Sequence, residues 1–313
     1  MTSPTIADLK RGAGGRTLSR SAVLRQSIEA GKLVVAIGAH DALSARLIER
    51  AGFDAIYVGS YSTEAAFLGG PDLALMSKTE RLLITRNIVK ATTVPVVVDI
   101  EEGYGNAINV MDAVRDFEAA GVSAVHLDDE KLPSKCPFLP GIPRNDLISV
   151  EEMQGKIRAA RDARESPDFM IIARSDVIGS IPREQYYEER RIEEVARRSN
   201  AYLDAGADAA FVMALTREEL QYFRDNIKGP LVGIFAPVEP LAIREFEETG
   251  YQIVIGSLVS LYMAARGLVD GLKALAETRD WNAVTGQMID DPEFFDIVGL
   301  QDYGAAYDRY GIE

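Results

Sequence analysis

The chain has 313 residues, of which 47% are hydrophobic and 26% charged, and this suits either two average domains or one large α/β barrel. Its formal net charge of −14 repels nucleic acid and anionic membrane surfaces, so we expect neither as a partner. No apolar run approaches the roughly 18 residues of a membrane span, and the single cysteine excludes an internal disulfide and indicates the reducing cytoplasm.

Eight short apolar runs follow one another along the chain, and an amphipathic segment of helical period comes after each. The runs cover residues 33–41, 54–60, 94–103, 122–130, 168–176, 208–214, 229–237 and 251–257. They are apolar on both faces, as in the strands of a parallel sheet that helices cover. Eight strands close a (β/α)₈ barrel, so the pattern predicts this α/β fold. A doubly wound open sheet is the alternative, although no GxGxxG motif follows the first run.

Both ends of the chain are expected to lie outside the barrel, which we place at residues 21–264. Residues 1–20 are polar and contain glycine, which predicts a flexible arm without the apolar segment of a signal peptide. Residues 265–313 have a helical pattern that ends rich in aromatic residues such as Tyr303 and Tyr310. This is too much apolar surface for a free tail, so we expect the segment to pack on the barrel or on a neighbouring subunit.

Acidic residues collect at the ends of the third and fourth predicted strands, and active sites of such barrels form at these strand ends. Asp99 and Glu101 alternate along one strand and are expected to share a face, and Asp128 ends the next strand. Converging carboxylates repel each other unless a hard cation neutralises them. With only two histidines in the chain, the set favours Mg²⁺, or alternatively Mn²⁺, over zinc. The other interpretation is that these acids cap helices or face solvent.

Arg174 ends the fifth predicted strand, directly before Ser175 and Asp176. A guanidinium at this place is suited to bind a substrate carboxylate or the charge that develops on an enolate oxygen. The alternative is a salt bridge to a neighbouring carboxylate.

Several segments, taken together and in order, resemble the isocitrate lyase/phosphoenolpyruvate mutase superfamily. They are GAHDALSARLIERAGFDAIYV, PVVVDIEEGYGN, VHLDDEKLPSKCPF, LISVEEMQGKI and FMIIARSD, spread between residues 33 and 260. The resemblance implies a barrel that commonly forms a tetramer and exchanges its C-terminal helices between subunits. It also implies Mg²⁺-dependent chemistry through an enolpyruvate or aci-carboxylate intermediate under a mobile loop.

The resemblance gives Cys136 a catalytic role. In the lyase branch, the mobile loop carries an acid/base cysteine, and Cys136 in the stretch Ser134-Lys135-Cys136-Pro137-Phe138 matches that position. The mutase and phosphonopyruvate hydrolase branches place Asn or Thr there, so Cys136 favours a lyase. A thiol beside Lys135 is expected to have some thiolate character. The alternative is an incidental loop cysteine.

Several positions depart from the family pattern. Pro137 and Phe138 replace Gly-His, and Ser134 replaces the first lysine of the loop. Glu101 stands where the family usually has Asp, and Asp128 where it usually has Glu. Because one side chain is longer and the other shorter, we expect Asp99, Glu101 and Asp128 to hold the metal.

Two more departures predict a pocket that is less polar than in tricarboxylate lyases. Met213 lies where lyases carry Glu and mutases His, and the stretch 59–61 replaces a Ser-Gly-Gly type sequence. We therefore hypothesise a substrate with an apolar group in place of one carboxylate. The residues expected to contact the substrate are Tyr57, Gly59, Ser60, Tyr61, Asp99, Lys135, Arg174 and Met213.

Together these features predict a Mg²⁺-dependent lyase that cleaves a C–C bond in a 2-hydroxy acid of the alkylmalate or methylisocitrate type and yields a 2-oxo acid. Mg²⁺ and Arg174 are expected to stabilise the enolate of the departing oxo acid, and Cys136 to protonate the other fragment. The alternatives are a phosphonomutase or carboxyphosphonoenolpyruvate enzyme, an oxaloacetate decarboxylase or hydrolase, and a barrel that binds a small acid without catalysis. We expect a small carboxylic acid as ligand and a homo-oligomer, either dimer or tetramer.

Overall fold

The computed structural model describes residues 18–136, 139–236 and 240–311. Residues 1–17, which make up most of the predicted N-terminal arm, lie outside this part. So do Pro137 and Phe138. None of the helices in the described ranges is long and apolar enough to cross a membrane.

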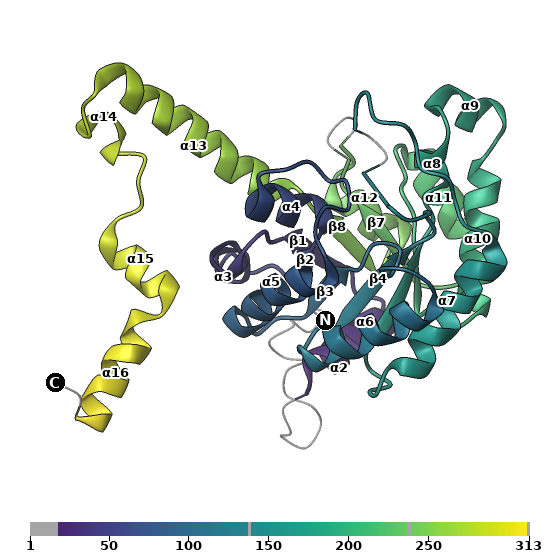
Figure 1. Cartoon of the computed structure of the whole chain (residues 1–313), viewed down its shortest axis with the longest axis horizontal. Coiled ribbons are helices and arrows are strands. Elements are labelled where there is room, and N and C mark those ends of the chain that lie inside the picture. Colours follow the sequence, from purple (N-terminus) through teal and green to yellow (C-terminus); the bar gives the residue numbers. More distant parts are fainter. Residues whose placement is uncertain (1–17, 137–138, 237–239, 312–313) are drawn as a thin grey trace.

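Within the described residues, eight parallel strands form a closed barrel in which β8 pairs with β1 (Figure 1). The prediction of a (β/α)₈ barrel is therefore confirmed, and the open sheet is excluded. The strands are β1 (Val34–Gly38), β2 (Ala55–Val58), β3 (Val96–Asp99), β4 (Ala124–Asp128), β5 (Met170–Arg174), β6 (Ala209–Phe211), β7 (Leu231–Ile234) and β8 (Ile253–Gly256).

Helices surround the barrel and follow each strand. Before β1 lies α2 (Arg20–Glu29). The helices between the strands are α3 (Ala42–Arg50), α4 (Ser60–Leu68), α5 (Lys78–Ala91), α6 (Ala107–Ala119), α7 (Val150–Ala163), α8 (Val177–Ser180), α9 (Arg183–Glu188), α10 (Ile192–Asp204), α11 (Arg217–Asn226) and α12 (Ile243–Thr249). After β8 come α13 (Val259–Thr278), α14 (Asn282–Thr285), α15 (Asp291–Val298) and α16 (Leu300–Tyr310).

The strands are buried on both faces, which explains why they read as continuous apolar runs. Alternate residues point into the barrel and form an inner cluster that includes Tyr57, Val97 and Phe211. Leu24 and Ile28 of α2 join this cluster. The opposite face of each strand packs under the helices, so the barrel is a filled core and its polar groups gather at the rim.

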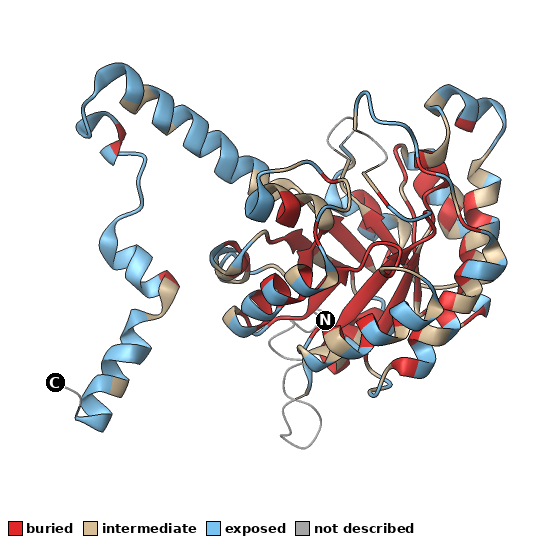
Figure 2. Cartoon of the chain, viewed as in Figure 1, coloured by how far each residue is buried: buried red, intermediate tan, exposed pale blue. Residues whose placement is uncertain are grey.

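The C-terminal helices differ from the rest in exposure. Figure 1 shows α13 leading away from the barrel, and Figure 2 shows that its surface is exposed. The predicted boundary between residues 264 and 265 falls inside this one continuous helix. Further along, α15 contacts α3, where Arg50 pairs with Asp296 and Arg46 donates to the carbonyl of Ile297 at 3.1 Å.

Gly38, at the end of β1, lies so close to the chain after β8 that a substitution there tests how tightly the strand ends pack. A Cβ atom there would lie 1.9 Å from the carbonyl oxygen of Ser257, so the backbone has to shift. We expect Gly38→Ala to lower the free energy of unfolding by about 2 kcal/mol. In Gly155→Ala, the control in α7, the added Cβ meets no atom within 4 Å. Gly155→Ala should raise the free energy of unfolding by about 0.5–1 kcal/mol, because alanine is the better helix former. Urea denaturation measures both, and equal effects would contradict the prediction.

Candidate active site

A cavity of about 520 Å³ opens at the carboxyl ends of the strands. Every residue for which the sequence predicts a role in catalysis, substrate binding or metal binding lines this cavity. These residues are Tyr57, Gly59, Ser60, Tyr61, Asp99, Glu101, Asp128, Lys135, Cys136, Arg174 and Met213. The chain therefore brings together residues of β2 to β5, of the start of α4 and of the segments that follow β3, β4 and β6, while their individual roles stay predictions.

His126, which the sequence analysis did not assign to the site, lies between two of the acids. It sits opposite Asp99 in the pairing of β3 with β4. Its Nδ1 is 3.0 Å from Asp128 Oδ1, and its Nε2 is 3.5 Å from Asp99 Oδ2. Nε2 also lies 2.7 Å from the hydroxyl of Tyr57, whose ring stacks on the imidazole. The imidazole thus fixes the orientation of both carboxylates.

The charges of this group depend on one another. Burial by itself lowers the pKa of His126, but Asp99 and Asp128 together raise it to about 9. Burial likewise opposes ionisation of Asp99, yet His126 and nearby arginines hold the pKa of Asp99 below its usual range. At neutral pH, the arrangement is therefore an imidazolium held against an ionised Asp99.

The same group is suited to a hard cation. Ligand atoms of Asp99, His126 and Asp128 lie within 4.8 Å of one another, and all three residues are buried. Both ring nitrogens of His126 already have partners, so carboxylate oxygens are the donors left for a metal. Oxygen donors of this kind suit Mg²⁺ or Mn²⁺.

Glu101 has a different place from the one predicted. The expectation that Asp99 and Glu101 share a strand face is wrong, because β3 ends at Asp99 and the backbone at Glu101 is left-handed with φ of 53°. The carboxyl group of Glu101 still lines the cavity, where it accepts hydrogen bonds from Arg81 at 2.8 Å and from Ser134 at 3.2 Å. It is absent from the group of candidate ligands around His126.

Arg174 lies among acids at the end of β5. Its Nη2 donates to Asp176 Oδ1 at 2.6 Å, and its Nη1 is 3.6 Å from Asp128 Oδ2. The guanidinium carbon is 5.1 Å from the centre of the Phe211 ring. The salt bridge that the sequence offered as an alternative is therefore present. Arg174 also faces the cavity, so its role toward a substrate stays a prediction.

Cys136 is held over the cavity by a loop that starts after β4. The base of the loop closes through a bridge between Glu130 and Leu147. The backbone N–H of Cys136 donates to the carbonyl oxygen of Asp72 at 3.1 Å, and Asn145 donates to the carbonyl oxygen of Lys135 at 2.9 Å. Cys136 is half-buried and lines the cavity.

Asp72 and Glu130 also line the cavity, although the sequence analysis gave them no role. Asp72 accepts a hydrogen bond from the Ser60 hydroxyl at 3.1 Å, and Glu130 accepts from the side chain of Asn145. Asp72 follows a Gly-Pro pair, which in sequence looks like an ordinary turn.

The sequence does contain a signal for the place of His126. Residues 126 and 128 alternate on one strand and therefore share a face, which puts the imidazole beside Asp128.

The remaining wall of the cavity is mainly apolar, with Arg144, Arg183 and Ser257 as its polar residues. Tyr61 and Tyr262 bring their hydroxyl groups within 3.2 Å and meet edge to face at the mouth. The aliphatic residues of this wall are Ile178, Met213, Leu215, Ile234 and Leu258. The cavity thus has an acidic side at β3 and β4 and a mainly apolar side formed by α8, β7, the segment after β6 and the start of α13.

Barrels of this architecture with an acidic rim form a broad class of enzymes. Comparison with known proteins shows to which family within this class the chain belongs. Residues 24–276 match the family model described as phosphoenolpyruvate phosphomutase, so the chain belongs to this family. The resemblance seen in the sequence is confirmed.

Individual relatives cover almost the whole chain. The 2,3-dimethylmalate lyase of Eubacterium barkeri is 38% identical over 91% of this chain and 96% of its own. A phosphoenolpyruvate phosphomutase structure from Streptomyces platensis subsp. rosaceus has a TM-score of 0.84 and 32% identity, and the match covers 94% of this chain and 99% of that one. A phosphonopyruvate hydrolase structure with oxalate and Mg²⁺ has a TM-score of 0.81 and 29% identity, with coverage of 94% and 99%. Lyase, mutase and hydrolase are therefore all similar to this chain.

The acidic side of the cavity predicts how stability depends on pH. Burial, together with Asp99 and Glu64 nearby, raises the pKa of Asp72 from 3.8 to about 7. Between these values the folded chain keeps a proton that the unfolded chain loses, so stability falls as pH rises. We expect Asp72→Asn to remove this loss, which is at most on the order of 4 kcal/mol.

Thermal unfolding in EDTA from pH 4 to pH 8 checks this expectation. Wild type and Asp72→Asn should have similar Tm values at pH 4 and diverge toward pH 8, where the variant is the more stable. The exposed Asp146→Asn serves as a control and should follow wild type. Parallel curves for wild type and Asp72→Asn would contradict the assignment.

Proposed function

We propose that the protein is a metal-dependent lyase that cleaves the C2–C3 bond of a 2-hydroxy acid of the alkylmalate type and releases a 2-oxo acid. The observation that carries the proposal is the placement of Cys136 and Arg174 in one cavity with an acidic side and an apolar side. A lyase of this kind needs a group to hold carboxylates, a proton donor for carbon and room for alkyl groups.

In the proposed C–C cleavage, each residue acts at a different step. The 2-hydroxyl proton leaves to a carboxylate of the acidic side, and the C2–O bond becomes a carbonyl as the C2–C3 bond breaks. The electron pair moves onto C3 and its carboxylate, which forms an enediolate, so the charge develops on the fragment that Cys136 protonates and not on the 2-oxo acid. Arg174 stabilises this developing charge, and the thiol of Cys136 donates its proton to C3. The products are a 2-oxo acid and a saturated acid, so atoms and electrons balance.

A divalent cation fits this site, with Asp99 and Asp128 as its oxygen ligands. Glu101, the third ligand expected from the sequence, lines the same cavity, but its two carboxylate oxygens already accept hydrogen bonds from Arg81 and Ser134. When bound, the cation supplies positive charge that orients substrate oxygens and lowers the energy of the developing enediolate. We propose Mg²⁺, with Mn²⁺ as the alternative. The Mg²⁺ in the phosphonopyruvate hydrolase structure supports this choice.

The apolar wall decides which acids bind well. A carboxylate packed against Met213, Leu215 and Ile234 would lose hydration that these side chains cannot replace, whereas a methyl group would be buried favourably. The similarity to a 2,3-dimethylmalate lyase supports a substrate with methyl branches. We therefore place dialkylmalates above tricarboxylates.

A turnover panel followed by NMR tests the function. It holds 2,3-dimethylmalate, 2-methylisocitrate, oxaloacetate and phosphonopyruvate, each with Mg²⁺ and with EDTA. We expect cleavage of the dimethylmalate to a 2-oxo acid, loss of cleavage in EDTA and recovery on addition of Mg²⁺. Cys136→Ser should lower kcat on the order of 10²–10⁴-fold.

Other outcomes of this panel point to the other candidates. Turnover of phosphonopyruvate that survives Cys136→Ser would indicate carbon–phosphorus chemistry. Decarboxylation or hydrolysis of oxaloacetate as the main reaction would indicate an oxaloacetate decarboxylase or hydrolase. No turnover, with a Tm that Mg²⁺ does not raise, would indicate a barrel that binds small acids without catalysis.

We also infer that a second copy of the chain covers α13, and that α13 to α16 are exchanged between subunits. None of the described residues of α13 is buried, although Met263, Leu268, Val269 and Leu272 are large and apolar. Leu268 and Leu272 are 63% and 61% exposed and lie one turn apart. A tetramer or dimer would remove this surface from water. The cytoplasmic location expected from the single cysteine stays a prediction.

Changes on α13 test the assembly. We expect Leu268→Glu combined with Leu272→Glu to convert the oligomer to a monomer, because buried charges without partners disfavour association. Arg158→Glu, at an exposed position of α7, alters net charge equally, since each Leu→Glu adds −1 and Arg→Glu changes +1 to −1. It should leave the oligomer intact. Sedimentation velocity gives the masses, and a monomeric wild type would contradict the inference.

A further inference from the structure

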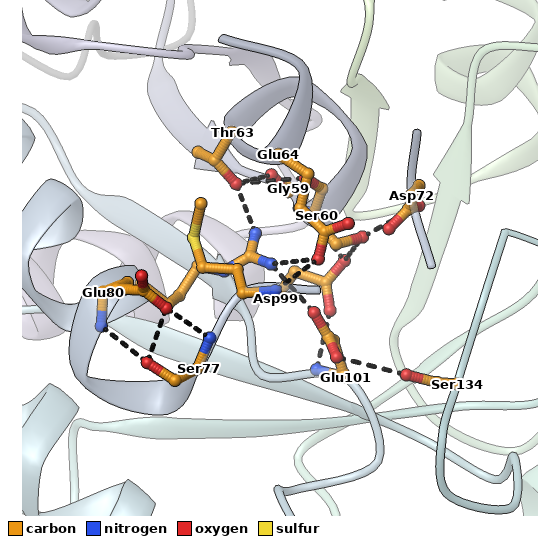
Figure 3. A network of polar contacts seen from close by, with 12 residues as sticks. Gly59, Ser60, Thr63, Glu64, Asp72, Ser77, Glu80, Asp99, Glu101 and Ser134 are labelled. Atoms are coloured by element: carbon orange, nitrogen blue, oxygen red, sulfur yellow. Dashed lines mark hydrogen bonds and ion pairs between the residues drawn. The ribbon is translucent and has the colours of Figure 1, made fainter. Parts of the chain in front are cut away.

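Two positions where the sequence departs from the family pattern, Glu101 and Ser134, are in contact. The hydroxyl of Ser134 donates to Glu101 Oε2 at 3.2 Å (Figure 3). Both side chains are nearly inaccessible to water, with 5% exposure for each residue. Ser134 lies two residues before Cys136, so this contact fixes the chain next to the thiol.

A buried arginine fixes Glu101 in turn. Arg81 of α5 has no exposed surface, and it donates to Glu101 Oε1 at 2.8 Å and to the hydroxyl of Thr63. A buried cation without an anionic partner is strongly destabilising, so Arg81 holds Glu101 firmly. With Arg81 on one oxygen and Ser134 on the other, both carboxylate oxygens of Glu101 have partners.

The same arginine reaches the cysteine loop along a second route. Its guanidinium is 3.9 Å from Glu64, whose carboxylate accepts the backbone N–H groups of Leu73 and Met76 at 3.1 Å each. These bonds hold the turn that contains Asp72, and the carbonyl oxygen of Asp72 accepts the N–H of Cys136. Figure 3 shows Glu64, Asp72, Glu101 and Ser134 arranged around this network.

Three consecutive residues of the loop are therefore anchored. Ser134 is held by Glu101, the N–H of Lys135 lies 3.4 Å from Glu130, and the N–H of Cys136 is held by Asp72. We propose that Glu101, held by Arg81, is a positioning residue that acts through Ser134 to place the thiol of Cys136 over the cavity. The catalytic meaning of this placement rests on the proposed lyase function, whereas the placement itself does not.

The chemistry of Cys136 offers a direct measurement. Because the chain has one cysteine, the rate of its reaction with the aromatic disulfide DTNB reports on this position alone. Ser134→Ala removes the hydrogen bond, so the thiol should react about 3- to 10-fold faster. Ser134→Thr keeps a hydroxyl and should react more slowly than Ser134→Ala. Lys131→Ala, at the exposed base of the same loop, should leave the rate unchanged.

A double-mutant cycle tests the route through Glu101. Glu101→Asp withdraws the carboxylate by one methylene and should also raise the DTNB rate. The double variant with Ser134→Ala should add little to either single change, because both remove the same contact. In the lyase assay, Ser134→Ala should lower kcat more than it raises KM, with an unchanged Mg²⁺ affinity by calorimetry.

The possible results separate the alternatives. An unchanged DTNB rate in Ser134→Ala would overturn the proposal. A Glu101→Asp variant with weaker Mg²⁺ binding and a wild-type DTNB rate would instead make Glu101 a metal ligand. If the DTNB rates change as expected but no substrate of the panel is cleaved, the positioning role stands and the lyase function fails.

Discussion

On β4, the imidazole of His126 is shared by two carboxylates, Asp99 of β3 and Asp128 of β4, and the polar side of the cavity depends on this arrangement. Two buried acids so close together repel each other, and in a medium of low polarity this repulsion is large. His126 relieves it because its two nitrogens face Asp128 and Asp99. The ring is itself held between the aromatic rings of Tyr57 and Phe211, which belong to the barrel interior. The apolar packing of the barrel thus sets the positions of charged groups at its rim.

The fold and the location of the site could be predicted because both follow from short-range patterns. Strands buried on two faces read as apolar runs, and a closed parallel barrel brings all their carboxyl ends to one rim. The direction of Glu101 could not be predicted in this way. It depends on where β3 ends, on the left-handed backbone after it, and on Arg81, which lies 20 positions earlier on another element. The role of His126 was not predicted, because two histidines in the chain argue only against a zinc site. Its contacts with Asp128 and Asp99 appear only once β3 and β4 are paired.

The division of the cavity into two sides has a consequence for selectivity. Aliphatic side chains such as Met213, Leu215 and Ile234 discriminate weakly between alkyl groups of similar size, because each methylene changes binding by only about 1 kcal/mol. The acidic side, in contrast, holds oxygen atoms at defined positions through Ser60, Arg174 and their partners. We therefore expect strict recognition of the carboxylate and hydroxyl pattern and tolerance for the length of the alkyl branch.

The helix that follows β8 connects the cavity mouth with a distant part of the molecule. Leu258 and Tyr262 at its first turn line the cavity, and the same helix continues without a break to Thr278. Twenty residues of α-helix are about 30 Å long. Such a rod acts as a lever, in which a tilt of about 5° at the mouth displaces the far end by roughly 2.5 Å. Whatever restrains the outer end of α13 therefore also restrains the angle of its first turn, and with it the width of the opening beside the Tyr61 ring.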